Sequence, residues 1–324
     1  MTSDMSNDVR DMPKNVAEIQ IEEVRRVPLR VPRCSPILLS FVRNEALQIN
    51  DFFRHYRDLG IRHFVMTDNG SDDGTFEFLN SQPDVDLYRY AGDYSAKIRN
   101  IVIQKCIERY GMGRWYVFVD GDEQIVFERA GEKSLEDLVH EMEARDISRV
   151  RGLLVDMYSS HLIGACGYQP GDTLKECHPF FDKDYREYNG NRLVWVKGGP
   201  RVRVFGSSDP LFDPILTKYP LFRAEDGDVI ESPHYMWPYE KNFASARFLG
   251  ILHFKFLPDF PSKLHRAVTE MRYWNKSFDY KIYADRLARE PDLSFMSPST
   301  GRYTSPADLV AAGVIDAVGW TLSE

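Results

Sequence analysis

Asp120 and Asp122, separated by Gly121, are the side chains best placed in this sequence for chemistry, since they directly follow a short apolar segment at residues 115–119. If the backbone stays extended, both carboxylates point to the same side, and the glycine lets a ligand approach the chain closely. Oxygen ligands of this kind favour Mg²⁺ or Mn²⁺, which often bind through one or two carboxylates plus the phosphate oxygens of a substrate. The motif therefore predicts a metal site for a nucleotide diphosphate. A plain surface turn is the alternative, because the tripeptide alone is common.

The residues before this motif alternate between apolar segments of strand length and segments of helical periodicity. Strands are predicted at 37–42, 63–67, 85–90 and 115–119, and helices at 47–59, around 76–79 and at 94–109. Such alternation with short connections predicts an α/β fold with a mostly parallel, Rossmann-like sheet and helices on both faces, because right-handed crossovers need a helix between parallel strands.

Polar side chains follow three of the predicted strands at the point where each ends. Asn44 and Glu45 follow the first strand, Asp68 follows the second, and the residues from Asp120 to Glu123 follow the fourth. In open α/β sheets, ligands bind outside the carboxyl ends of the strands, so these side chains are expected at one edge. The repulsion between several carboxylates there calls for a cation.

Composition and charge narrow the class of protein. The 324 residues are 43% hydrophobic with a formal net charge of −8, which argues against a general nucleic-acid partner. No apolar run approaches the roughly 20 residues of a membrane span, and the first residues are polar and acidic, so we expect a cytoplasmic protein without a transmembrane span, peripheral membrane association remaining open. The four cysteines have no spacing typical of a zinc site or a disulfide framework, which indicates reduced thiols.

Four segments in order, SFVRNEA, TDNGSDDGT, KIRN and FVDGDE, together resemble the family 2 glycosyltransferases with the GT-A fold, over residues 36–122. A later segment at 252–256, LHFKF, resembles a bacterial subset of that family. The resemblance implies a hexosyltransferase-like enzyme that moves a sugar from a nucleotide-diphosphate sugar to a glycan or another hydroxyl acceptor. Cell-surface glycan synthesis is the expected setting.

Individual roles follow from the same resemblance. It implies nucleotide-sugar contacts for Asn44, Glu45, Asp68, Arg99, Asn100 and Asp120. Asp120 and Asp122 would bind Mn²⁺ or Mg²⁺, and His253 would complete the metal site. Lys255 could face the same direction as His253 and neutralise the diphosphate. A core histidine and a surface lysine are the alternatives for these two residues.

The Glu225–Asp226 pair resembles the acidic pair that follows the metal motif in family 2, which makes Asp226 the expected catalytic base, with Glu225 beside it. A solvated acidic loop is the alternative, and Asp182, Asp184 and His234 are competing candidates for the base. Aromatic residues gather at 232–239, where they could stack against a sugar acceptor or simply pack.

The chain is expected to divide into a tail at residues 1–33, a nucleotide-sugar-binding α/β half at 34–150 and an acceptor-side half of the same domain at 151–258. Further strands are predicted at 150–157 and 193–204. A helical C-terminal segment at 259–324 is predicted to hold two helices, and the apolar residues of these helices are Phe260, Leu264, Val268, Met271 and Trp274 in the first and Tyr283 and Leu287 in the second.

Two alternative functions use the same kind of fold. A sugar-nucleotide nucleotidyltransferase could use a similar sheet and metal, although the sequence has no early loop rich in glycine and basic residues for a triphosphate. A non-catalytic carbohydrate-binding or scaffold protein is the other alternative, because fold alone does not establish function. The sequence also lacks a dinucleotide-binding fingerprint, a phosphate-binding loop and a complete calcium-binding loop.

Overall fold

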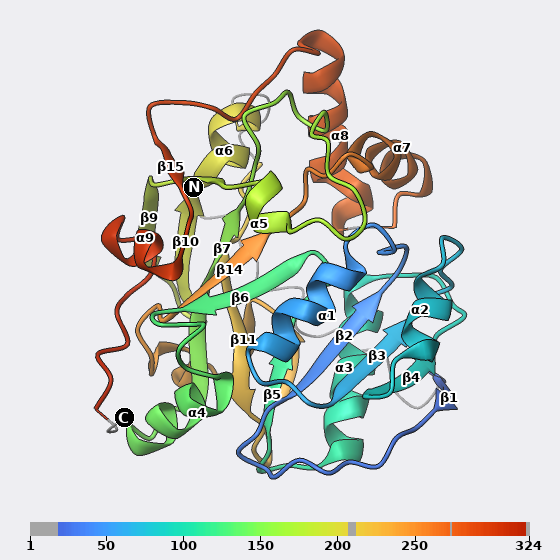
Figure 1. The fold of residues 1–324 in the computed structure, drawn as a ribbon, viewed down its shortest axis with the longest axis vertical. Coiled ribbons are helices and arrows are strands. Elements are labelled where there is room, and N and C mark those ends of the chain that lie inside the picture. The colour runs from blue at the N-terminus through green and yellow to red at the C-terminus, as the bar shows by residue number, and fades with distance from the viewer. Residues whose placement is uncertain (1–18, 207–211, 273, 322–324) are drawn as a thin grey trace.

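The computed structural model describes residues 19–206, 212–272 and 274–321 (Figure 1). Within these ranges, nine strands form one sheet in the order β1-β4-β3-β2-β5-β11-β7-β14-β6. The strands are β1 (Glu22–Arg25), β2 (Ile37–Val42), β3 (Phe64–Asp68), β4 (Val85–Arg89), β5 (Trp115–Phe118), β6 (Glu123–Phe127), β7 (Arg149–Asp156), β11 (Thr217–Arg223) and β14 (Leu249–His253).

Six of these strands run in one direction, which confirms the predicted mostly parallel α/β sheet. Strands β4, β3, β2 and β5 are parallel neighbours, and β7 and β14 continue in the same direction beyond β11. Strands β1, β11 and β6 run the opposite way, each antiparallel to its neighbours. Consequently the N-terminal ends of β11 and β6 lie at the same edge of the sheet as the carboxyl ends of the parallel strands.

Helices cover both faces of the sheet. They are α1 (Ile49–Asp58), α2 (Thr75–Ser81), α3 (Ala96–Tyr110), α4 (Leu135–Ala144), α5 (Leu174–Cys177), α6 (Gly199–Phe205), α7 (Phe260–Glu270), α8 (Trp274–Arg289) and α9 (Pro306–Ala311). Side chains of α1, α2 and α4 pack with Leu38 and Val42 of β2 in one apolar cluster, whereas α3 packs with Ile37, Leu39 and Phe41 in another. The alternation along β2 is the one that a strand covered on both faces requires.

Small strands and a short 3-10 helix complete the described chain. They are β8 (Phe180–Asp182), β9 (Tyr185–Asn189), β10 (Val194–Gly198), β12 (Val229–Ser232), β13 (Tyr235–Trp237), η2 (Tyr239–Phe243) and β15 (Thr300–Arg302). The two predicted C-terminal helices correspond to α7 and α8, which lie near one end of the molecule, while α4 lies near the other (Figure 1). The side chain of Trp274 is outside the described part of the structure.

The predicted strand at 193–204 was wrong in its second half, since only β10 is extended and α6 follows at once. Gly198 and Gly199 have φ angles of 125° and 73°, which end the strand, and Pro200 occupies the first turn of the helix. The predicted tail at 1–33 contains an edge strand, β1, whose sequence EEVR shows no apolar period. Residues 1–18 of that tail lie outside the described residues. No helix in the described ranges is long and apolar enough to cross a bilayer.

Candidate active site

Asn44 and Asp68 lie at the carboxyl ends of β2 and β3, where their side chains fix the local loops. Asn44, with a φ of 58°, donates from Nδ2 to Asp72 at 2.8 Å and accepts from the Asp72 backbone N–H at 3.0 Å. The Asp68 carboxylate accepts from the backbone N–H groups of Gly70 and Ser71 at 3.0 and 3.2 Å. Both side chains therefore shape the edge of the sheet, next to the expected nucleotide.

Asp120 lies at the carboxyl end of β5, between two cations. Arg99 of α3 donates to one of its oxygens at 3.0 Å, and Lys218 of β11 donates to the other at 3.0 Å. Although burial favours the neutral acid, the charges of Arg99 and Lys218 lower the pKa of Asp120 to about 2. Lys218 also forms an ion pair with Glu123, whose side chain is buried. In this arrangement both oxygens of Asp120 are occupied by side chains of the protein.

Lys218 was missed in the sequence analysis because its position depends on strand direction. It is the second residue of β11, which runs antiparallel to β5, and the pairing of Leu221 with Val117 brings Lys218 level with Asp120. The segment 217–223, TKYPLFR, contains a proline and a lysine, so it did not predict a central strand.

Asp122 and His253, more than a hundred residues apart in the chain, face each other across the same edge. His253 ends β14, which pairs antiparallel with β6 so that His253 lies opposite Glu123. The distance from His253 Nε2 to Asp122 Oδ2 is 3.4 Å, and ligand atoms of Asp122, Glu123 and His253 all lie within 4.8 Å of one another. The structure thus brings together two of the three residues predicted to bind the metal.

The other nitrogen of the His253 ring is held by Asp156, the last residue of β7. Nδ1 lies 2.6 Å from Asp156 Oδ1, and Arg201 of α6 donates to the other oxygen of Asp156 at 2.7 Å. Burial lowers the pKa of His253, but the carboxylates of Asp122 and Asp156 outweigh it and raise that pKa above its ordinary value. With the Nδ1 proton donated to Asp156, a divalent ion that displaced the Nε2 proton would meet the Nε2 lone pair beside Asp122, as in carboxylate–histidine–metal groups. This donor set fits Mn²⁺ or Mg²⁺ bound by Asp122 and His253.

Two lysines from the C-terminal part of the chain reach this edge. Lys263 of α7 lies 3.3 Å from Glu45 Oε2. Although burial favours the neutral acid, the charges of His253, Lys255 and Lys263 lower the pKa of Asp122. Burial raises the pKa of Glu45 to about 7, although Lys263 opposes the change. Lys255 donates to the Tyr280 hydroxyl at 2.9 Å. Lys263 on α7 and Lys255, two residues after β14, therefore add positive charge beside the carboxylates.

Glu225 and Asp226, the predicted catalytic pair, do not reach this edge. They follow β11, whose carboxyl end lies beside the start of β5, where Arg223 pairs with Trp115. Since a strand rises about 3.3 Å per residue, residues 115 to 120 separate the two edges by about 16 Å. Glu225 is bound by Lys241 at 2.6 Å, and Asp226 is exposed. The two residues lie at the opposite edge because β11 runs antiparallel to β5.

The competing candidates for the base are mostly engaged in structural contacts. Asp182 accepts from the Tyr158 hydroxyl and from Arg203, and Asp184 accepts from Ser299. His234 lies beside Lys218, and its Nδ1 donates to a backbone carbonyl at 2.7 Å. Burial and the neighbouring Lys218 charge lower the pKa of His234 to about 3.

Asn100 and the aromatic segment at 232–239 meet at the β12–β13 hairpin. Asn100 of α3 donates to the Glu231 carbonyl at 2.6 Å, which holds the hairpin against α3. Trp237 is 49% exposed and packs edge-on against Tyr239, with ring centroids 5.1 Å apart. An exposed aromatic face therefore exists in this segment, and its use as an acceptor platform remains a prediction.

No protein-family model and no curated protein matches this chain. Solved structures similar to it include TarS from S. aureus, at 16% identity over 38% of this chain and 35% of that chain, with a TM-score of 0.27. The chain thus spans about a third of the TarS structure. HddC from Yersinia pseudotuberculosis is 9% identical over 70% of this chain and 80% of its own, with a TM-score of 0.28. A UDP-glucose pyrophosphorylase from Acinetobacter baumannii is 10% identical over 86% of this chain and 91% of its own, with a TM-score of 0.29. At such low identities and TM-scores these similarities support no functional inference, so the function is inferred from the geometry of the site alone.

Proposed function

We propose that this chain is a metal-assisted glycosyltransferase that uses a nucleotide-diphosphate sugar as donor and a hydroxyl, in a cell-surface glycan or another molecule, as acceptor. The observation that carries the proposal is the placement of His253, with Nε2 facing Asp122 and Nδ1 held by Asp156. An Asp–His pair oriented by a second carboxylate, outside the carboxyl ends of parallel strands, is suited to a divalent ion and its phosphate ligands.

Asp122 and His253 would hold the ion, while Arg99 and Lys218 keep Asp120 ionised beside it. When bound, Mn²⁺ or Mg²⁺ would neutralise the negative charge that grows on the departing nucleoside diphosphate. Lys255 and Lys263 would add further positive charge next to Asp122, where both charges favour the ionised carboxylate. Asn44 and Asp68 would shape the neighbouring loops against the nucleotide.

Calorimetric titration with UDP, GDP, CDP and TDP and their sugars, in Mn²⁺, in Mg²⁺ and in chelator, tests this proposal. We expect one nucleotide to bind in a metal-dependent way, and Asp122→Asn to weaken that binding by at least about tenfold, or about 1.4 kcal/mol. The matched control is Asp226→Asn, which should bind like the wild type. Binding that ignores both the chelator and the Asp122 substitution would overturn the metal site.

A nucleotidyltransferase remains the second candidate, because it would bind the same nucleotide sugar at the same edge. The bound nucleotide sugar separates the two. Release of nucleoside diphosphate on addition of a glycan acceptor supports the transferase, whereas formation of nucleoside triphosphate from pyrophosphate supports the alternative. Tight metal-dependent binding without either reaction would favour a non-catalytic protein.

A further inference from the structure

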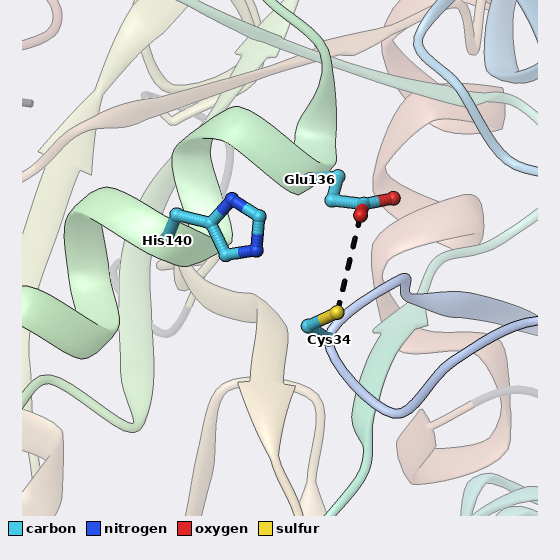
Figure 2. A group of neighbouring side chains, drawn as sticks. All are labelled: Cys34, Glu136 and His140. Atoms are coloured by element: carbon cyan, nitrogen blue, oxygen red, sulfur yellow. Dashed lines mark hydrogen bonds between the residues drawn. The ribbon is translucent and has the colours of Figure 1, made fainter. Parts of the chain in front are cut away.

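A second group of metal-ligating side chains lies away from the carboxylate edge. Cys34 precedes β2, and Glu136 and His140 are on α4 (Figure 2). One donor atom from each residue lies within 4.8 Å of the other two. Glu136 and His140 are four residues apart, so they lie on the same side of α4, facing the Cys34 thiol. Cys34 and Glu136 are 102 residues apart in sequence, which is why cysteine spacing gave no sign of the group.

The two segments that carry these ligands are held firmly. The backbone N–H of Trp115 donates to the carbonyl of Arg33 at 3.2 Å, which fixes the chain just before Cys34. Helix α4 begins with a capping box formed by Ser134 and Asp137, and its apolar side packs in the core. Ligands placed on rigid elements need little rearrangement to bind an ion, so the ordering cost is small.

Neighbouring contacts leave the thiol and one carboxylate oxygen turned toward each other. Ser35 donates to Oε2 of Glu136, which leaves Oε1 3.9 Å from the Cys34 sulfur. The nearby cation Arg33 points elsewhere, since it donates to the Met112 carbonyl at 2.6 Å. His140 is exposed, so an ion from solvent can reach the group.

We propose that Cys34, Glu136 and His140 form a second metal site, which takes a borderline divalent ion such as Zn²⁺ and links the segment before β2 to α4. Sulfur, carboxylate oxygen and imidazole nitrogen are the ligands of Zn²⁺ and Co²⁺, while Mg²⁺ and Mn²⁺ prefer oxygen. Three protein ligands leave the remaining position to water. Binding replaces the thiol proton, which passes to solvent as the sulfur–metal bond forms.

This site differs from the proposed active site in both place and ligand chemistry. Glu136 lies in the first turn of α4, whose Leu135 N–H bonds to the Leu59 carbonyl at the end of α1, before β3. It is therefore near the starting ends of the parallel strands. The proposal does not depend on the transferase assignment, because neither Asp122 nor His253 takes part.

Co²⁺ titration of the full chain, followed by absorption, tests the proposal directly. A cobalt–thiolate bond gives a sulfur-to-metal charge-transfer band in the near ultraviolet, which an oxygen–nitrogen site does not produce. We expect one equivalent of Co²⁺ to give this band, and an equivalent of Zn²⁺ to remove it by competition. Cys34→Ser should abolish the band, and His140→Ala should weaken Co²⁺ binding at least about tenfold.

Two matched controls keep the result specific. Cys166→Ser removes a buried thiol elsewhere in the chain and should leave the band intact. Asp122→Asn removes the proposed active-site ligand and should also leave it intact. His140 is exposed, so loss of binding in His140→Ala with an unchanged far-ultraviolet spectrum cannot be a folding defect. Absence of the band in the wild type, or its persistence in Cys34→Ser, would overturn the site.

Discussion

Asp156→Asn probes the geometry on which the proposed function depends. The Asp156 carboxylate is 1% exposed and lies 2.6 Å from His253 Nδ1 and 2.7 Å from Arg201 Nε. An asparagine of the same shape keeps an oxygen acceptor but loses the charge. Losing the partner that orients a metal-binding histidine typically lowers metal affinity 10- to 100-fold, which corresponds to about 1.4–2.8 kcal/mol.

The same substitution removes the carboxylate that pairs with Arg201 at 2.7 Å, and Arg201 is 6% exposed. Removing one member of a buried ion pair costs about 3–5 kcal/mol of stability, less here because asparagine still accepts a hydrogen bond. We therefore expect the free energy of unfolding to fall by about 3 kcal/mol, measured by urea denaturation at pH 7. Mn²⁺ affinity is measured on the folded protein by calorimetry.

Asp228→Asn is the matched control, because it breaks the comparable buried pair with Arg149, 2.8 Å apart, at the other edge of the sheet. It should lower stability to a similar extent and leave Mn²⁺ affinity unchanged. If Asp156→Asn lowers stability alone, as the control does, Asp156 serves only the fold. The inference that it orients His253 for a metal would then be refuted.

Three further substitutions test other contacts. In Gly121→Ala the new Cβ would lie 2.9 Å from Cγ of Glu45, so we expect a loss of about 1–3 kcal/mol in urea denaturation. Lys218→Met leaves the buried carboxylate of Glu123 without its cation, which should cost about 3 kcal/mol by the same measurement. Burial lowers the pKa of His55 to about 3, and the charge of the neighbouring Lys175 adds a smaller effect in the same direction. Below pH about 6.5 the folded state therefore binds fewer protons than the unfolded state. His55 should therefore contribute a loss of stability of about 1.4 kcal/mol per pH unit as the pH drops below that value, and His55→Gln should reduce the slope of the wild-type profile by this amount, while His178 and His234, whose pKa values are also lowered, keep their own contributions.

Each of these has a distinct control or contradicting outcome. Gly167→Ala places a Cβ in open space and should be nearly neutral, so an equal loss would contradict the close approach at Gly121. Lys255→Met removes a lysine bonded to a hydroxyl and should cost less than Lys218→Met. Parallel pH profiles of the wild type and His55→Gln would show that His55 titrates alike in both states.

The local elements of the first half of the chain could be predicted from sequence because their signals are local. The six residues at 37–42, five of them apolar, are buried without exception, and the helical spacing of Phe52, Phe53 and Tyr56 matches the buried side of α1. The predicted strand ends also located Asn44, Asp68 and Asp120 at one edge of the sheet, because the carboxyl ends of parallel strands lie at the same edge.

Strand direction and order in the second half were decided by the tertiary structure alone. Lys218 and Asp226 belong to the same stretch of chain around β11, yet the antiparallel pairing with β5 brings the lysine to Asp120 and sends the aspartate to the far edge. No local pattern distinguishes these two outcomes, because an isolated strand looks the same in either direction.

The sequence by itself therefore determined which residues have side chains suited to chemistry. It also determined that several of these residues lie at the ends of strands. Only the tertiary structure decided which distant partners meet them, since the pairing of β14 with β6 and β7 sets His253 between Asp122 and Asp156. The same holds for Cys34, Glu136 and His140, which come together through the packing of α4 beside the start of β2. Such contacts depend on how buried surfaces fit together over the whole chain, which no spacing within a segment encodes.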